Sequence, residues 1–185
     1  FNTVVTDGSW TNIKTARMEG LKSYYGNAIS EHADRHLDLV GLGNLLAMAP
    51  QKDYNALAGQ RYRSEFGSNR VYFLSSAVEK EKQHEDQKSR TAVNHDHQVL
   101  FSADTTFSKL ASLISQGAKT KQTNISNSFS YEDYQKQYGN RAIPLFAFNE
   151  KRQLRFFTDE AALVPSPGWT ITALVLEDVE KALLT

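Results

Sequence analysis

Short apolar runs alternate with helical patterns over residues 1–75, which is the order expected for strands and helices that build one sheet. The expected strands lie at residues 3–6, 23–25, 45–49 and 70–74. The expected helices lie at residues 10–17, 31–39 and 52–66. Because parallel strands need a crossover between them, usually a helix, this alternation predicts an α/β fold with a parallel sheet.

The second half of the chain mixes strands and helices in a less regular order. Helical spacing of apolar residues marks residues 104–114 and 130–138, with Asp104 as the expected N-cap of the first of these helices. The expected strands lie at residues 99–101, 118–125, 142–148, 154–157 and 169–176. The turn-rich residues 149–152 predict a hairpin between the third and fourth of these strands.

The two halves are separated by residues 76–97, a run of mixed charges without an apolar period. Such a run is typical of a solvated linker or an exposed helix. The predicted architecture is therefore a truncated Rossmann-like parallel sheet at residues 1–75, a charged linker at 76–97 and a small α+β domain at 98–185.

Polar or small residues close the first three expected strands. Asp7 ends the first strand, Gly26-Asn27 follows the second, and Ala49-Pro50 ends the third. Ligands of open α/β sheets bind at the carboxyl ends of strands, and an acid at the end of the second strand of a dinucleotide fold binds the ribose. The partner Gly-rich turn is expected roughly 20 residues upstream of that acid. We therefore interpret the sequence as a fragment that begins just before the second strand, and as the alternative Asp7 caps the following helix.

Composition excludes several functional classes. Lys+Arg and Asp+Glu are both 21 among 185 residues, so no overall charge favours nucleic acid, and we expect no nucleic-acid partner. The absence of cysteine excludes disulfides, thiolate metal sites and a cysteine nucleophile. No apolar run reaches the roughly 20 residues that span a bilayer.

Candidate catalytic and metal sites are weak. The sequence has no Gly-x-Ser-x-Gly, His-Glu-x-x-His or Walker motif. His32 and His36 share one helix face, and His84 and His95–His97 lie in or beside the charged run, but a metal site needs more ligands. We therefore predict no catalytic residues and no metal site.

Two stretches resemble a known family. The first reads V-T-D-G-S-W-T-N-I-K-T-A-R-M-E-G-L-K-S-Y-Y-G-N-A and continues as L-L-A-M-A-P-Q-K-D-Y-N-A-L-A. The second reads A-I-P-L-F-A-F, then R-F-F-T, then P-G-W-T-I-T-A-L. Both are similar to the cytosolic tail of bacterial sodium or potassium cation/proton antiporters, which carries a Rossmann-like regulator-of-potassium-conductance (potassium-uptake nucleotide-binding) domain. The likeness covers most of the chain.

The resemblance implies a nucleotide site. Asp7 matches the acid that contacts the adenosine ribose, and Gly26-Asn27 matches a Gly-Asp pair on the adenine side, with Asn27 in place of the usual Asp. Asn55 is the nearest match to an Asn that faces the phosphates. The implied cofactor of the intact parent is NAD(H) or an adenine nucleotide. Without the upstream Gly-rich turn, this fragment by itself is expected to bind poorly or not at all.

The resemblance also implies a role and a location. The chain would be the nucleotide-sensing regulatory domain of a monovalent cation/proton antiporter, at the cytoplasmic face of the bacterial inner membrane. Its partners would be the transmembrane domain of the same polypeptide and further copies of itself. A missing first strand would leave residues 3–6 and 45–49 with open edges, which recruit other chains, so we expect a homodimer or larger assembly. The alternative is a fragment of a nicotinamide-dependent oxidoreductase.

Overall fold

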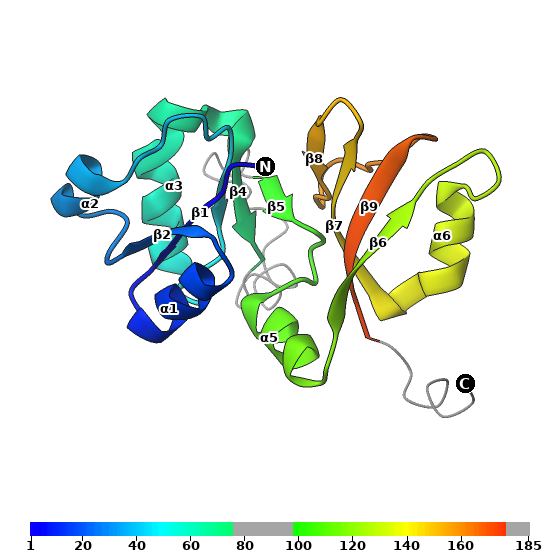
Figure 1. Cartoon of the computed structure of the whole chain (residues 1–185), viewed down its shortest axis with the longest axis horizontal. Coiled ribbons are helices and arrows are strands. Elements are labelled where there is room, and N and C mark those ends of the chain that lie inside the picture. The colour runs from blue at the N-terminus through cyan, green and yellow to red at the C-terminus, as the bar shows by residue number, and fades with distance from the viewer. Residues whose placement is uncertain (76–97, 177–185) are drawn as a thin grey trace, which may run out of the picture. The chain divides into compact units, whose positions relative to one another are not determined.

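The computed structural model describes residues 1–75 and 98–176 (Figure 1). The chain divides into two compact units, Phe1–Tyr72 and Phe73–Thr185. The predicted charged linker lies outside the described residues, as does the end of the chain after residue 176. The predicted domain boundaries at residues 75 and 97 therefore stay predictions.

In the first unit every strand is followed by a helix until the chain reaches β4. The elements are β1 (Val4–Asp7), α1 (Trp10–Met18), β2 (Lys22–Tyr25), α2 (Glu31–His36), β3 (Leu45–Ala47), α3 (Lys52–Phe66), a 3-10 turn (Ser68–Arg70) and β4 (Val71–Leu74). The expected order of strands and helices is confirmed. β4 crosses the boundary between the two units.

β1 and β2 form a parallel two-stranded sheet, with α1 as the crossover between them. Val4 is opposite Lys22 and Asp7 is opposite Tyr25, so both strands end at the same edge. β3 does not belong to this sheet. Among the described residues, β1 is therefore paired on one side only. The chain thus combines helices with a parallel sheet, but the prediction that all strands of residues 1–75 build one sheet is wrong, because β3 and β4 are neighbours in a separate sheet.

Helix boundaries follow local hydrogen bonds. α3 begins and ends at the predicted residues, and Gly67 follows it with φ of 80°. α2 ends at His36 and not at Leu39 as predicted, because Leu37 is extended and the Asp38 carboxylate accepts the N–H of Val40. A local bond from an Asp side chain to the backbone competes with the helix and ends it.

The second unit is built on an antiparallel sheet. Its elements are β5 (Gln98–Leu100), α5 (Phe107–Ser115), β6 (Lys119–Asn124), α6 (Tyr131–Tyr138), a 3-10 turn (Gly139–Arg141), β7 (Ala142–Asn149), β8 (Leu154–Phe156) and β9 (Trp169–Val175). Four of these strands form the sheet in the order β6-β9-β7-β8. The predicted hairpin of β7 and β8 is confirmed.

Two details of the second unit depart from simple patterns. The ladder between β7 and β9 shifts between Pro144 and Phe146, so Leu145 is an extra residue in β7. The prediction that Asp104 is the N-cap of α5 is wrong. α5 is capped by Thr106, whose hydroxyl accepts the Lys109 N–H. Both Asp and Thr are good caps, and only the fold decides which one has the required extended conformation.

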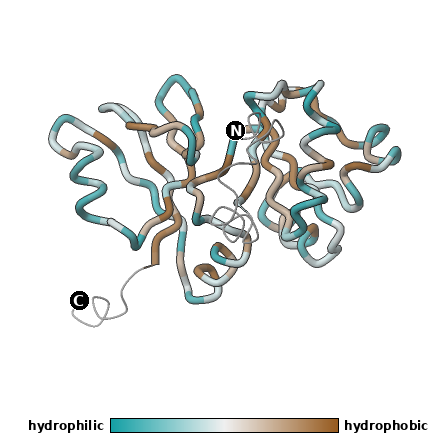
Figure 2. Tube along the Cα trace, turned by 180° about the vertical axis from the view of Figure 1, so that it is seen from behind, coloured by the Kyte–Doolittle hydropathy of each residue, from teal (hydrophilic) through white to brown (hydrophobic). Residues whose placement is uncertain are grey.

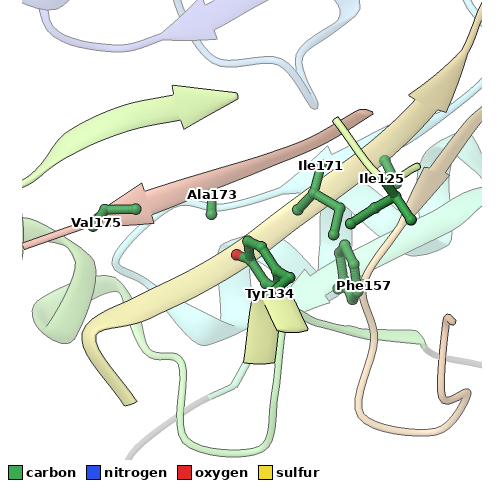
Figure 3. Close-up of a cluster of buried hydrophobic side chains, with 7 residues drawn as sticks. Ile125, Tyr134, Phe157, Ile171, Ala173 and Val175 are labelled. Carbon is green, nitrogen blue, oxygen red and sulfur yellow. The ribbon is translucent and has the colours of Figure 1, made fainter. Parts of the chain in front are cut away.

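The hydrophobic core of the second unit lies between one face of the sheet and α6 (Figure 3). β9 supplies the centre, with Ile171 fully buried. α6 covers it with tyrosines, of which Tyr134 is 3% exposed. Figure 2 colours α6 largely as hydrophilic, because Glu132, Asp133, Gln135, Lys136 and Gln137 stand between its tyrosines, whose rings are large and mostly apolar. The cluster consists of Ile125, Tyr134, Ala147, Phe157, Ile171, Ala173 and Val175.

α6 starts with a capping box. The Ser130 hydroxyl accepts the Asp133 N–H, and the Asp133 carboxylate accepts the Ser130 N–H. The Ser130 N–H and the Ser130 hydroxyl both donate to the Asp133 carboxylate, and these two bonds hold the pKa of Asp133 below its ordinary value. The box fixes the start of the helix whose tyrosines cover the sheet.

The Tyr134 hydroxyl is buried and has no hydrogen-bond partner among the described residues. Its burial raises the pKa of Tyr134 above the ordinary value. Tyr134→Phe removes an unpaired polar group, so we expect the free energy of unfolding at neutral pH to stay unchanged or to rise by about 1 kcal/mol.

The same substitution should alter the alkaline limb of the stability profile. Because the folded-state pKa of Tyr134 is raised, the fold resists ionisation of this side chain, so the wild type loses stability as the pH rises above the unfolded pKa of about 10. Urea unfolding measured above that pH should therefore show a larger loss in the free energy of unfolding for the wild type than for Tyr134→Phe. An equal loss in both proteins would contradict the assignment of this burial effect to Tyr134.

Candidate functional site

The structure brings three of the four predicted site residues together at the ends of β1 and β2. Asp7 is the last residue of β1, and Gly26 and Asn27 directly follow β2. The Gly26 N–H donates to the Asp7 carbonyl oxygen at 3.0 Å, which continues the parallel ladder by one step. We refer to Asp7, Gly26 and Asn27 as the strand-end cluster.

The Asp7 carboxylate is half-buried and already held in one orientation. One oxygen accepts the Ser9 N–H at 2.7 Å, and the other accepts the Asn12 side-chain amide at 2.8 Å. An ionised carboxylate has about four acceptor positions, so roughly one remains on each oxygen. The side chain therefore combines fixed geometry with spare acceptor capacity.

The helix-cap alternative for Asp7 is met only in part. Ser9 is the N-cap residue of α1, and its side chain makes no capping bond. Asp7 lies two residues before it and bonds to the Ser9 N–H and to a side chain, not to the backbone of the first helical turn. Its contribution to the helix start is thus indirect.

The turn after β2 needs a glycine. Gly26 has φ of 140°, and a Cβ there would lie 3.3 Å from the Tyr24 ring. The exposed Asn27 side chain accepts the Ile29 N–H with its oxygen. This leaves the two N–H groups of the Asn27 amide as donors, since an amide nitrogen carries two.

Asn55, the fourth predicted residue, is buried and 6% exposed. Its amide oxygen accepts the Ala49 N–H at 2.9 Å, and its nitrogen donates to the Ala49 carbonyl at 2.8 Å. This pair of bonds positions the turn between β3 and α3. The phosphate contact predicted for Asn55 stays a prediction, and the structure gives the side chain a positioning role.

Two tyrosines of α3 hold the turn after β2. The Tyr54 hydroxyl accepts the Ala28 N–H at 2.9 Å, and the Tyr62 hydroxyl donates to the Ala28 carbonyl. Burial raises the pKa of Tyr62, so the hydroxyl stays protonated to a higher pH than that of an exposed tyrosine. The sequence pattern does not reveal this contact, although residues 54, 58 and 62 recur at helical spacing, because their backbone partner is distant in the chain.

His32 and His36 form a local pair. Their rings stack with centroids 4.0 Å apart, His32 Nδ1 lies 2.8 Å from the Tyr24 hydroxyl, and His36 Nδ1 donates to the His32 carbonyl. Residues 1–75 and 98–176 contain no group of three or more His, Cys, Asp or Glu side chains that could hold a metal ion. The candidates His84 and His95–His97 lie outside the described residues.

No known protein-family model matches the sequence, and no curated protein matches it. None of the helices in the described part of the chain has both the length and the apolar character needed to cross a membrane. Function is therefore inferred from the geometry of the strand-end cluster and from the resemblance described above.

Asn55→Ala should lower the free energy of unfolding by about 1–3 kcal/mol, because it leaves the Ala49 backbone groups without their amide partner. Leu57→Ala is the matched control on the same helix, since Leu57 is 52% exposed and its loss should cost about 0.5 kcal/mol or less. Urea unfolding of both variants measures the difference. Equal losses would show that the amide pair does not stabilise the turn.

Proposed function

We propose that this chain is the nucleotide-sensing regulatory domain of a monovalent cation/proton antiporter. The observation that carries the proposal is the strand-end cluster, in which an acid, a glycine and an amide meet at the ends of adjacent parallel strands. Strand ends of α/β sheets are where such folds bind nucleotides. The resemblance of the sequence to antiporter tails supplies the transporter context.

The cluster offers complementary groups to an adenosine. The remaining acceptor positions of Asp7 suit two ribose hydroxyls, which are donors, and the Asn27 amide nitrogen suits a ring nitrogen of adenine, which is an acceptor. At Gly8, which follows Asp7, an added Cβ would meet no described atom within 4 Å, so a ligand has room beside the backbone. Short charge-assisted bonds to Asp7 would dominate the affinity.

Regulation would follow from a nucleotide that prefers one arrangement of the domain over another. A ligand shifts an equilibrium only by its difference in affinity for the two states. In the proposal the two states are two geometries of a domain dimer, and the dimer acts on the transmembrane part of the same polypeptide. Nucleotide binding and the dimer geometry would then be linked reciprocally, so the geometry that the nucleotide favours would also bind it more tightly.

Asp7→Ala should weaken nucleotide binding roughly ten- to a hundredfold, since a hydrogen bond to a charged acceptor contributes about 1.5–3 kcal/mol. Calorimetric titration of the complete gene product with NAD(H), ATP and AMP measures this. Asp38→Ala is the matched control, because Asp38 also accepts a backbone N–H two residues later but lies outside the cluster.

The stability of the same variants separates binding from folding. If Asp7 serves only the start of α1, Asp7→Ala should lower the urea midpoint and leave the affinity unchanged, which would refute the ribose contact. Absence of binding at nucleotide concentrations up to about millimolar would refute the nucleotide proposal as a whole. Hydride transfer from NADH to carbonyl substrates would favour the oxidoreductase instead.

The domain should also self-associate. β1 has a pairing partner on one side only within the described residues, and its Val4 and Val5 are half-buried. Open hydrophobic strand edges recruit other chains. Sedimentation equilibrium at ~50 µM, within the micromolar range where such edges associate, should show a dimer or larger species. A monomer at that concentration would contradict the expected assembly.

A further inference from the structure

A second open edge lies in the antiparallel sheet of the second unit. β6 is the outermost strand in the order β6-β9-β7-β8, beside β9 (Figure 1). All of its residues are exposed except the half-buried Thr123. It reads Lys-Thr-Lys-Gln-Thr-Asn, so it carries positive charge and neither acidic nor apolar side chains.

Hydrogen bonds next to β6 determine which of its backbone groups face outward. The Ile125 N–H donates to the Trp169 carbonyl at 2.8 Å, and the Ile125 carbonyl accepts the Gly168 N–H, so Ile125 faces β9. Backbone direction alternates along an antiparallel strand. Residues 119, 121 and 123 therefore also face β9, and Thr120, Gln122 and Asn124 direct their N–H and C=O groups away from it.

The opposite side of β9 gives the same result. The Leu176 N–H donates to the Arg141 carbonyl next to β7, so the odd-numbered residues of β9 face β6. These are the residues whose register partners are 119, 121 and 123. Among the described residues, no hydrogen bond is seen to the outward backbone groups of Thr120, Gln122 and Asn124. The edge is thus ready to pair with one more strand.

The side chains of β6 indicate which charge the added strand should carry. Lys119 and Lys121 are opposite Val175 and Ala173, so both lie on the sheet face that α6 covers. The Lys121 ammonium lies 5.5 Å from the centre of the Tyr138 ring. Two lysines at alternate positions favour a partner strand with acidic residues at alternate positions, and opposite charges across a strand pair are stabilising.

The same lysines disfavour a second copy of this chain as the partner. β6 paired antiparallel with itself about a two-fold axis would bring Lys121 opposite or diagonal to Lys121 of the other copy. Like charges on neighbouring strands are destabilising, and edge lysines are a known protection against self-pairing.

We propose that β6 binds an extended acidic peptide segment as an added strand of this sheet. The partner's backbone pairs with Thr120, Gln122 and Asn124, and its alternate carboxylates meet Lys119 and Lys121. Backbone pairing supplies the affinity, and the lysines supply the selectivity for acidic peptides. Strand addition in other proteins divides these roles in the same way between backbone and side-chain contacts. This surface shares no residue with the strand-end cluster, and the proposal does not depend on nucleotide binding.

The test uses the full chain and a fluorescein-labelled peptide, Ser-Glu-Val-Glu-Val-Glu-Ser, with blocked ends and fluorescence anisotropy as the readout. We expect saturable binding that weakens with added salt, and at least about tenfold weaker binding for the double variant K119E/K121E. The matched control is K151E/R155E, which makes the same charge change at exposed positions of the β7–β8 hairpin, where Arg155 belongs to the opposite edge strand and Lys151 to the turn. It should bind the peptide like the wild type.

Backbone pairing is tested separately. Gln122→Pro removes one outward N–H that would bond to the peptide, so binding should weaken. The fold should tolerate the proline, because in an edge strand proline is accepted where its nitrogen faces away from the sheet. Near-ultraviolet circular dichroism checks that the variant is folded. A peptide N-methylated at alternate residues tests the same bonds without changing the protein, and one of the two N-methylation patterns should abolish binding.

Four outcomes would overturn the proposal. Three concern the peptide: no binding at about millimolar concentration, equal binding of the lysine version Ser-Lys-Val-Lys-Val-Lys-Ser, and binding unaffected by both N-methylation patterns. The fourth is a dimer that Gln122→Pro converts to monomer, which would assign the edge to a second copy. Nucleotide titration of the same samples is independent, so failure of peptide binding leaves the nucleotide proposal standing.

Discussion

The first unit depends on hydrogen bonds from α3 to backbone groups of the turns that carry its strand ends. Its buried apolar side chains are mostly small, with alanines at positions 16, 28, 33, 47 and 58. Small side chains bury little area and so contribute little hydrophobic free energy. Tyr54 and Tyr62 hold Ala28, and Asn55 holds Ala49. The position of the strand-end cluster is therefore set by polar contacts whose geometry is directional.

The second unit is stabilised differently. Aromatic and branched side chains fill the space between α6 and the sheet, and two strands far apart in the sequence, β6 and β9, pair along their whole length. Packing of this kind is non-directional and grows with buried area. It leaves the outer backbone of β6 uncommitted, because the core needs only one face and one edge of that strand.

The sequence was sufficient to predict the order of elements, since apolar periodicity reflects local geometry. α3 and the hairpin of β7 and β8 are at the predicted positions. The end of α2 and the cap of α5 were not predicted correctly, because several neighbouring residues could end or cap each helix and tertiary context selects one of them. In the site, Asp7 and Gly26 meet because neighbouring parallel strands end at the same edge. This meeting could be predicted once the sequence pattern had placed the strand ends. The bonds of Asn55 and Tyr62 join backbone groups whose positions only the folded chain defines.

The extra residue in β7 has a consequence for how this strand tolerates changes in length. Ala142 and Pro144 before the bulge lie on the same sheet face as Ala147 after it, since their partners in β9 are Val175, Ala173 and Ile171. Deleting a residue from a strand normally turns everything beyond it to the other face. Losing Leu145 would instead restore a regular ladder with every side chain on its present face. Loss of this one residue would therefore leave each side chain of β7 on its present face, and the bond given up would be the one from the Phe157 N–H to the Leu145 carbonyl.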